Sequence, residues 1–132
     1  MRPKLIGQKL LAFLLILLSS CEEILFEEDI SSVQITVLAP VDESVLAQSP
    51  SSLSWGRVDD VLTYDVQIVS PSFEAASNLV LDTVINQSVN TVIRLDLEQL
   101  FDGEYEWRII GRNNNYETLS TVSSFRIGSP IN

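Results

Sequence analysis

One stretch of the sequence, residues 100–111, constrains the fold more than any other. After Gly103 it alternates large apolar residues with glutamate and arginine, and the apolar set is Tyr105, Trp107 and Ile109. A period of two residues is typical of a β-strand with one buried face and one face in water. Two large aromatic rings on one face supply much of the buried area that a small domain needs. The stretch therefore predicts a central strand over residues 104–112.

The same alternation recurs along the body of the chain, and no convincing helical period accompanies it. It predicts seven strands, over residues 33–37, 52–56, 63–69, 79–85, 89–97, 104–112 and 119–127. Strands with a single apolar face need a second layer to bury that face. We therefore expect an all-β fold, a seven-stranded antiparallel β-sandwich.

Five aromatic residues at inward positions of these strands are the expected core: Trp55, Tyr64, Tyr105, Trp107 and Phe125. The two tryptophans could instead stack on sugars, as aromatics do in glycan-binding modules, but their inward register favours packing. The single cysteine rules out an internal disulfide. Buried apolar surface must then stabilise the domain alone.

Three further aromatic residues fall in predicted loops: Phe73, Phe101 and Tyr116. Loops carry a disproportionate share of binding residues, so these three are the candidates for contact with a partner. The alternative is that they cap the ends of the sandwich.

The first twenty residues have the pattern of a secretory signal peptide. Basic residues precede a nine-residue apolar run, residues 10–18, and small residues follow it. The run is far shorter than the roughly 20 residues that a membrane-spanning helix needs. We expect residues 1–20 to be a cleaved leader, with an uncut transmembrane anchor as the less favoured alternative.

Cys21 is the only cysteine, and its position offers a role for it. The motif Leu18-Ser19-Ser20-Cys21 resembles the lipobox of bacterial lipoproteins. That resemblance implies lipidation of the Cys21 sulfur and a membrane anchor, because two or more acyl chains hold a protein stably in a bilayer. Residues 21–32 then form a lipidated acidic tether. The acidic run also resembles the surface-export signal of lipoproteins in one group of Gram-negative bacteria.

The charge of the chain excludes some functions. After Ser20 the sequence holds five arginines, no lysine and 18 carboxylates, a net charge of −13. Nucleic-acid binding needs clustered basic residues, so we expect no nucleic-acid partner. The chain has no histidine, which excludes a Ser-His-Asp triad and removes a frequent zinc ligand. We therefore do not expect an enzyme.

Several acids could join in a calcium site: Asp42, Glu43, Asp59, Asp60 and Asp82. Oxygen ligands are what calcium prefers, but no loop here has the alternating acidic spacing of such sites. We expect these acids to be solvated, and we expect no metal and no cofactor.

Residues 33–128 resemble a fibronectin type III domain, which is an immunoglobulin-like fold. The resemblance rests on Leu53-Ser54-Trp55, on Tyr64-Asp-Val-Gln-Ile68, on Leu100-x-x-Gly103-x-Tyr105-x-Trp107 and on Asn113. It implies a tyrosine corner, in which the Tyr105 hydroxyl bonds back to backbone before its strand. The chain is also similar to single-domain bacterial lipoproteins that share Ser-Pro-Ser-Phe and Leu-Asp-Thr-Val, here residues 70–73 and 81–84. Residues 129–132 are then a tail.

Together these features predict an outer-membrane, lipid-anchored β-sandwich that acts as a non-catalytic interaction or spacer module at the cell surface. The alternative is an accessory glycan-binding lipoprotein of a polysaccharide-uptake system. The lipid anchor would be the contact with the membrane, and the sequence does not indicate which protein or glycan is the partner. Asp82-Thr83-Val84 also resembles the short O-glycan acceptor of some Gram-negative surface proteins, with an ordinary strand threonine as the alternative.

Overall fold

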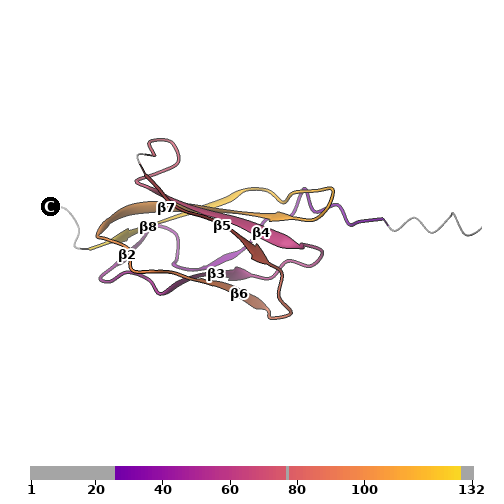
Figure 1. The fold of residues 1–132 in the computed structure, drawn as a ribbon, viewed down its shortest axis with the longest axis horizontal. Coiled ribbons are helices and arrows are strands. Elements are labelled where there is room, and N and C mark those ends of the chain that lie inside the picture. The colour runs from indigo at the N-terminus through magenta and orange to yellow at the C-terminus, as the bar shows by residue number, and fades with distance from the viewer. Residues whose placement is uncertain (1–25, 77, 129–132) are drawn as a thin grey trace, which may run out of the picture.

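The described part of the chain folds into two β-sheets packed face to face (Figure 1). The structure is a computed structural model that describes residues 26–76 and 78–128, so the predicted leader, Cys21 and the tail lie outside it. The strands are β1 (Val37–Ala39), β2 (Ser44–Leu46), β3 (Ser52–Gly56), β4 (Thr63–Ser70), β5 (Asn78–Asn86), β6 (Val92–Asp96), β7 (Gly103–Arg112) and β8 (Thr121–Ile127). One sheet has the order β1-β3-β6 and the other β2-β8-β7-β4-β5. The prediction of an all-β sandwich is confirmed.

The predicted number of strands was wrong, because the described residues form eight. In the predicted first strand, residues 33–37, only Val37 pairs with another strand. From Val37 onward the chain forms two short strands in place of one. β1 pairs with β3 in the smaller sheet, and β2 pairs with β8 in the larger one. Pro40 lies between the two, and it lacks the N–H that a continuous ladder would need. The fold is also not wholly antiparallel, since β2 and β8 run parallel.

All five predicted core aromatics lie in the interior, between the two sheets. The rings of Trp55 and Tyr64 meet edge to face with centroids 5.5 Å apart, and the Trp55 and Trp107 rings are 6.2 Å apart. Tyr105 and Phe125 stack at 5.3 Å. Aromatic pairs at such distances contribute about 0.5–1.5 kcal/mol each beyond the area they bury. The two contacts of Trp55 join the sheets, because Trp55 comes from β3 and its partners come from β4 and β7, whereas Tyr105 and Phe125 are neighbours within the larger sheet.

The packed body begins upstream of the expected boundary at residue 33. Ile30 is buried to the same degree as Ile35 and belongs to the same core. Glu27 and Glu28 are bound to the turn between β7 and β8, as described below, so they are part of the folded body and not of a free tether.

Gln87 fixes the end of β5 to β4 and to the loop that precedes β4. Its N–H donates to the Leu62 carbonyl (2.9 Å) and its side-chain amide donates to the Val58 carbonyl (2.6 Å). The Tyr64 hydroxyl donates to Gln87 Oε1 (2.8 Å) and accepts from the Val58 N–H (3.0 Å). Burial raises the pKa of Tyr64, and these hydrogen bonds oppose that rise.

Candidate functional site

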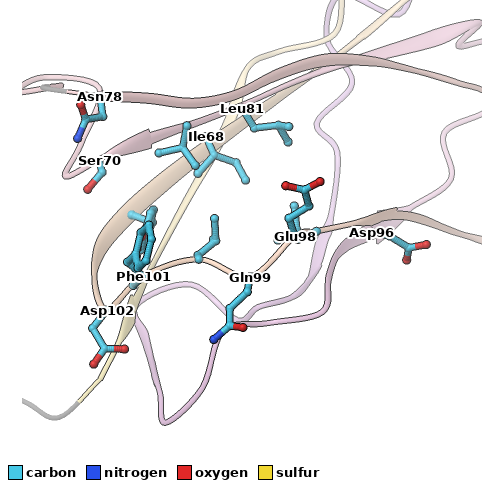
Figure 2. A pocket seen from close by; sticks show the side chains of 13 residues that line it. Ile68, Ser70, Asn78, Leu81, Asp96, Glu98, Gln99, Phe101 and Asp102 are labelled. Atoms are coloured by element: carbon cyan, nitrogen blue, oxygen red, sulfur yellow. The ribbon is translucent and has the colours of Figure 1, made fainter.

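A large hollow of the described surface lies at the open side of the sandwich, between β5 and the segment 96–102, which begins at the last residue of β6. We call it the β5 groove. Its volume is about 770 Å³, within the range of ligand-binding clefts. Figure 2 shows Ile68 and Leu81 on one side of the opening, with Glu98, Gln99 and Phe101 on the other.

The groove has an apolar floor and a polar rim. The apolar and aromatic residues that line it are Ile68, Val80, Leu81, Leu97, Leu100, Phe101 and Tyr105. The polar residues are Ser70, Asn78, Asp96, Glu98, Gln99 and Asp102. All three ionisable groups of this rim are carboxylates, and they are exposed. The groove therefore offers apolar contact below and negative charge at its mouth.

Backbone and side-chain hydrogen bonds hold the wall of the groove in place. The Tyr105 hydroxyl donates to the Phe101 carbonyl at 2.6 Å, which is the tyrosine corner expected from the sequence. The Leu100 N–H donates to Ser49 Oγ (2.8 Å), and the Leu97 N–H donates to the Ser51 carbonyl (2.8 Å). Burial, with a smaller effect of the Asp102 charge, raises the pKa of Tyr105, and the hydrogen bond to Phe101 opposes that rise. The wall is thus a fixed part of the fold.

The three loop aromatics do not form one surface. Phe101 is 89% exposed at the groove, two residues before β7. Phe73 is half-buried on the outer face of the larger sheet, where the Arg108 guanidinium lies 4.5 Å from its ring centroid and Glu106 Oε1 accepts its N–H. Tyr116 lies beyond the other end of β7 and is 36% exposed. Of the three, Phe101 alone combines a freely exposed ring with a neighbouring hollow.

The outer face of the larger sheet carries paired charges. Arg112 binds Asp65 and Glu117, and Arg126 binds Glu104. Hydrogen bonding to Asp65 is the main cause of the raised pKa of Arg112. Because these charges already have partners, this face is a weaker candidate for a binding site than the groove.

The remaining residues that the sequence singled out lie on β5 and in turns. Thr83 is half-buried on β5, whereas its neighbours Asp82 and Val84 are exposed. Asp59 pairs with Arg57, and Asp42 accepts the Ser124 N–H (2.9 Å). Within residues 26–76 and 78–128 no group of three or more carboxylate, histidine or cysteine side chains is arranged to hold a metal ion. The same residues contain no helix long and apolar enough to span a membrane.

The structure adds two features that the sequence had not indicated. One is the groove itself, which depends on the approach of β5 to the segment 96–102 and so leaves no local signal. The other is the attachment of the N-terminal acids to the turn between β7 and β8. A weak signal for the second existed in the apolar residue that directly follows those acids, since Ile30 is a core residue.

The fold and the groove define an all-β protein of the β-sandwich class with an open, acidic-rimmed side. No protein-family model matches the chain, and no curated protein sequence does. Among solved structures it is similar to CopC from Methylosinus trichosporium OB3b, with a TM-score of 0.54 and 15% identity over 75% of this chain and 98% of that one. It also matches 21% of the endo-β-1,4-mannanase from Thermotoga petrophila over 78% of its own length, at 14% identity and a TM-score of 0.49. The likeness to CopC supports the sandwich fold.

Proposed function

We propose that this chain is a lipid-anchored, fibronectin type III-like domain that is displayed at the outer surface of the outer membrane as a non-catalytic interaction module. The observation that carries the proposal is the way the N-terminal segment is bound to one end of the sandwich. It gives an anchored domain a defined orientation, with the β5 groove directed away from the membrane.

The N-terminal segment binds the turn between β7 and β8. Glu27 accepts from the Asn114 N–H and from Asn115 Nδ2, the latter at 3.2 Å. The Glu28 carbonyl accepts from Asn113 Nδ2 at 2.9 Å. Asn113 also donates to the Asp60 carbonyl (3.2 Å), which joins this turn to the loop before β4.

A short link to the membrane follows if Cys21 is lipidated. Five residues separate Cys21 from Glu27, and six residue steps span at most about 20 Å even when fully extended. The bound turn at the end of β7 would therefore face the membrane. β7 has ten residues, so its other end, with Phe101 and the groove, would lie roughly 30 Å further out.

The fibronectin type III-like assignment is supported by the tyrosine corner and by the pairing of the strands. Tyr105 bonds to the Phe101 carbonyl from the position that this motif occupies in immunoglobulin-like sandwiches. The proposal that the module is non-catalytic is supported by the side chains that are present. The chain lacks histidine, and the groove carboxylates are exposed and therefore solvated, without the burial that tunes a catalytic acid.

Metabolic labelling tests the anchor. Cells that express the full chain are given radiolabelled palmitate, alongside the variants Cys21→Ala and Ser20→Ala. We expect label in the wild type and in Ser20→Ala, because a small residue is kept before the cysteine, and no label in Cys21→Ala. A Cys21→Ala variant that stays labelled and membrane-bound would refute the anchor.

Protease treatment of intact cells tests the display. A surface domain is degraded from outside, whereas a domain that faces the cell interior survives until the outer membrane is opened. Survival in intact cells, with labelling of Cys21 unchanged, would leave the anchor in place and refute the surface orientation.

Glycan binding is the second candidate, and the exposed Phe101 ring beside the polar rim is the observation that favours it. Trp55 and Trp107 are fully buried and are not available to stack on a sugar. A polysaccharide array probed with the detergent-solubilised full chain and with Phe101→Ala tests this candidate. Binding that Phe101→Ala abolishes supports it, and no binding to any polysaccharide removes it.

A further inference from the structure

We propose that the outer edge of β5 pairs, strand to strand, with an extended segment of a partner protein whose lysine or arginine side chains reach the carboxylates of the β5 groove. This inference rests on the proposed role of the chain as an interaction module and names the site and the chemistry of its partner.

The first observation is the state of the β5 edge. β5 is the outermost strand of the larger sheet, and its nine residues make it the longest edge of the sandwich. Long edges are usually protected by lysine, proline or a covering segment, because they can template pairing with another chain. β5 contains neither lysine nor proline and carries one charged side chain, Asp82. Three of its aliphatic residues are exposed, Leu79 at 62%, Val80 at 36% and Val84 at 61%.

The second observation is the direction of the backbone groups. In an antiparallel ladder, alternate residues direct both N–H and C=O toward the same neighbouring strand. The Gln87 N–H donates to Leu62, and the register pairs Ile85 with Tyr64 and Thr83 with Val66. Residues 81, 83 and 85 therefore face β4. Asp82, Val84 and Asn86 direct their N–H and C=O groups to the open edge, where an added strand would lie.

The third observation is the space beside the edge. The β5 groove lies along the first half of β5, and a second hollow of about 560 Å³ lies beside Ile85 and Asn86, against the start of β6. A strand added to β5 would extend the larger sheet over these hollows. Its alternate side chains would then point inward, onto the groove floor.

Charge selects the partner. A long basic side chain can lay its methylene groups on Leu81 and Leu97 while its charged head reaches Asp96 or Glu98, since such side chains pack their stems on apolar surface. A second copy of this chain is a poor occupant. It would bring no lysine, a net charge of −13 after Ser20, and a second Asp82 to the same edge. A basic partner is attracted by the same charges.

The binding experiment uses the full chain in detergent and a probe of defined composition, an acetylated ten-residue peptide of alternating valine and lysine. We expect saturable one-to-one binding that weakens with salt, and no binding of the matched peptide of valine and glutamate. Val84→Pro removes an outward N–H without touching the ladder to β4, and proline is tolerated on edge strands. It should weaken binding at least about fivefold, the factor that the loss of one backbone hydrogen bond produces. Val84→Thr keeps the N–H and should bind within about twofold of the wild type.

Two further measurements separate strand pairing from simple charge attraction. The peptide is N-methylated at every valine or, separately, at every lysine, which leaves its charge unchanged. In an extended peptide the valine N–H groups lie along one edge and the lysine N–H groups along the other. Strand pairing uses only one of these edges, so one of the two methylated peptides should lose binding. The substitution Glu98→Gln should weaken binding more than Glu43→Gln, which makes the same change in net charge on the β1–β2 turn. These measurements hold even if Val84→Pro fails to fold.

The proposal is overturned if both methylated peptides bind like the parent, if Glu98→Gln and Glu43→Gln have equal effects, or if the full chain shows no saturable binding. A dimer that Val84→Pro dissociates would replace the basic partner by a second copy. None of these outcomes depends on lipidation, so a failure here would leave palmitate labelling of Cys21 and the anchored display intact.

Discussion

Gly111 on β7 is a position where one added methyl group tests the packing of this sandwich directly. A Cβ placed there would lie 2.9 Å from Val61 Cγ2 and 3.0 Å from Thr118 Cγ2, whereas ordinary contacts begin near 3.4 Å. Val61 is only 2% exposed, and Thr118 is held because its hydroxyl accepts the Gly111 N–H at 2.9 Å. Neither neighbour can move aside freely. Overpacking of this kind costs about 1–3 kcal/mol, and we expect Gly111→Ala to destabilise the domain by that amount.

A double-mutant cycle shows whether Val61 is the cause. Val61→Ala removes two buried methyl groups and should cost about 1.6 kcal/mol from the loss of burial alone. In the double variant the new methyl of residue 111 enters the space that Val61 vacates. We therefore expect the double variant to be about 1–2 kcal/mol more stable than the sum of the single effects predicts.

Urea unfolding of residues 22–132, followed by tryptophan fluorescence, measures these differences, because both indoles leave the core on unfolding. With a slope of about 1–3 kcal/mol per molar urea, a loss of 2 kcal/mol shifts the midpoint by roughly 1 M. Gly56→Ala is the matched control, since its Cβ would find no atom nearer than 3.8 Å. A Gly111→Ala variant as stable as Gly56→Ala, or a cycle that is additive within about 0.5 kcal/mol, would show that the contact with Val61 does not limit packing.

Three further predictions concern the tyrosines and Gly103, the first residue of β7. Tyr105→Phe should cost about 1 kcal/mol because it removes the bond to the Phe101 carbonyl, and Tyr116→Phe should change stability by less than about 0.5 kcal/mol in the same urea assay. Gly103→Ala should cost about 1–3 kcal/mol, since residue 103 has a φ of +152° that side chains disfavour, and a neutral effect would contradict that backbone geometry. Burial raises the pKa of Tyr64 and of Tyr105 above 10.0, so their contribution to stability is complete below pH 10 and is lost as pH rises through the folded-state values. Denaturation midpoints measured from pH 8 upward should fall above pH 10, and a flat or rising profile there would contradict the assignment.

The sequence predicted most of the fold where the signal is local. β3 was predicted with the bounds it has, and β4, β5 and β7 were each predicted within one residue at either end, because alternation marks β3, β4 and β7 and short apolar runs mark β5. The tyrosine corner was expected from the resemblance to a fibronectin type III domain, and the residues that carry it, Leu100, Gly103 and Tyr105, lie close together in the sequence. The start of β8 and both ends of β6 were less well predicted. The residues that flank these strands continue the alternation but do not pair with a neighbouring strand.

The first strand and the candidate site could not be predicted in this way. Ile35 has the alternation of a strand and is buried, yet its segment joins no ladder until Val37. Alternation indicates which face of an extended segment is buried. It does not indicate whether the backbone of that segment pairs with a neighbouring strand. The groove depends on which strand forms the edge and on how close residues 96–102 approach it. Those are properties of the pairing of distant segments, and no local pattern encodes them.

The bonds of Gln87 imply an uneven distribution of local unfolding along β5. At that end the strand is attached through Leu62, Val58 and Tyr64, whereas the end at Asn78 borders the open groove. Local unfolding of β5 should therefore begin at Asn78 and proceed toward Gln87. Amide hydrogens near Asn78 should exchange with solvent first. A strand bound to β5 should therefore also begin to dissociate at the Asn78 end.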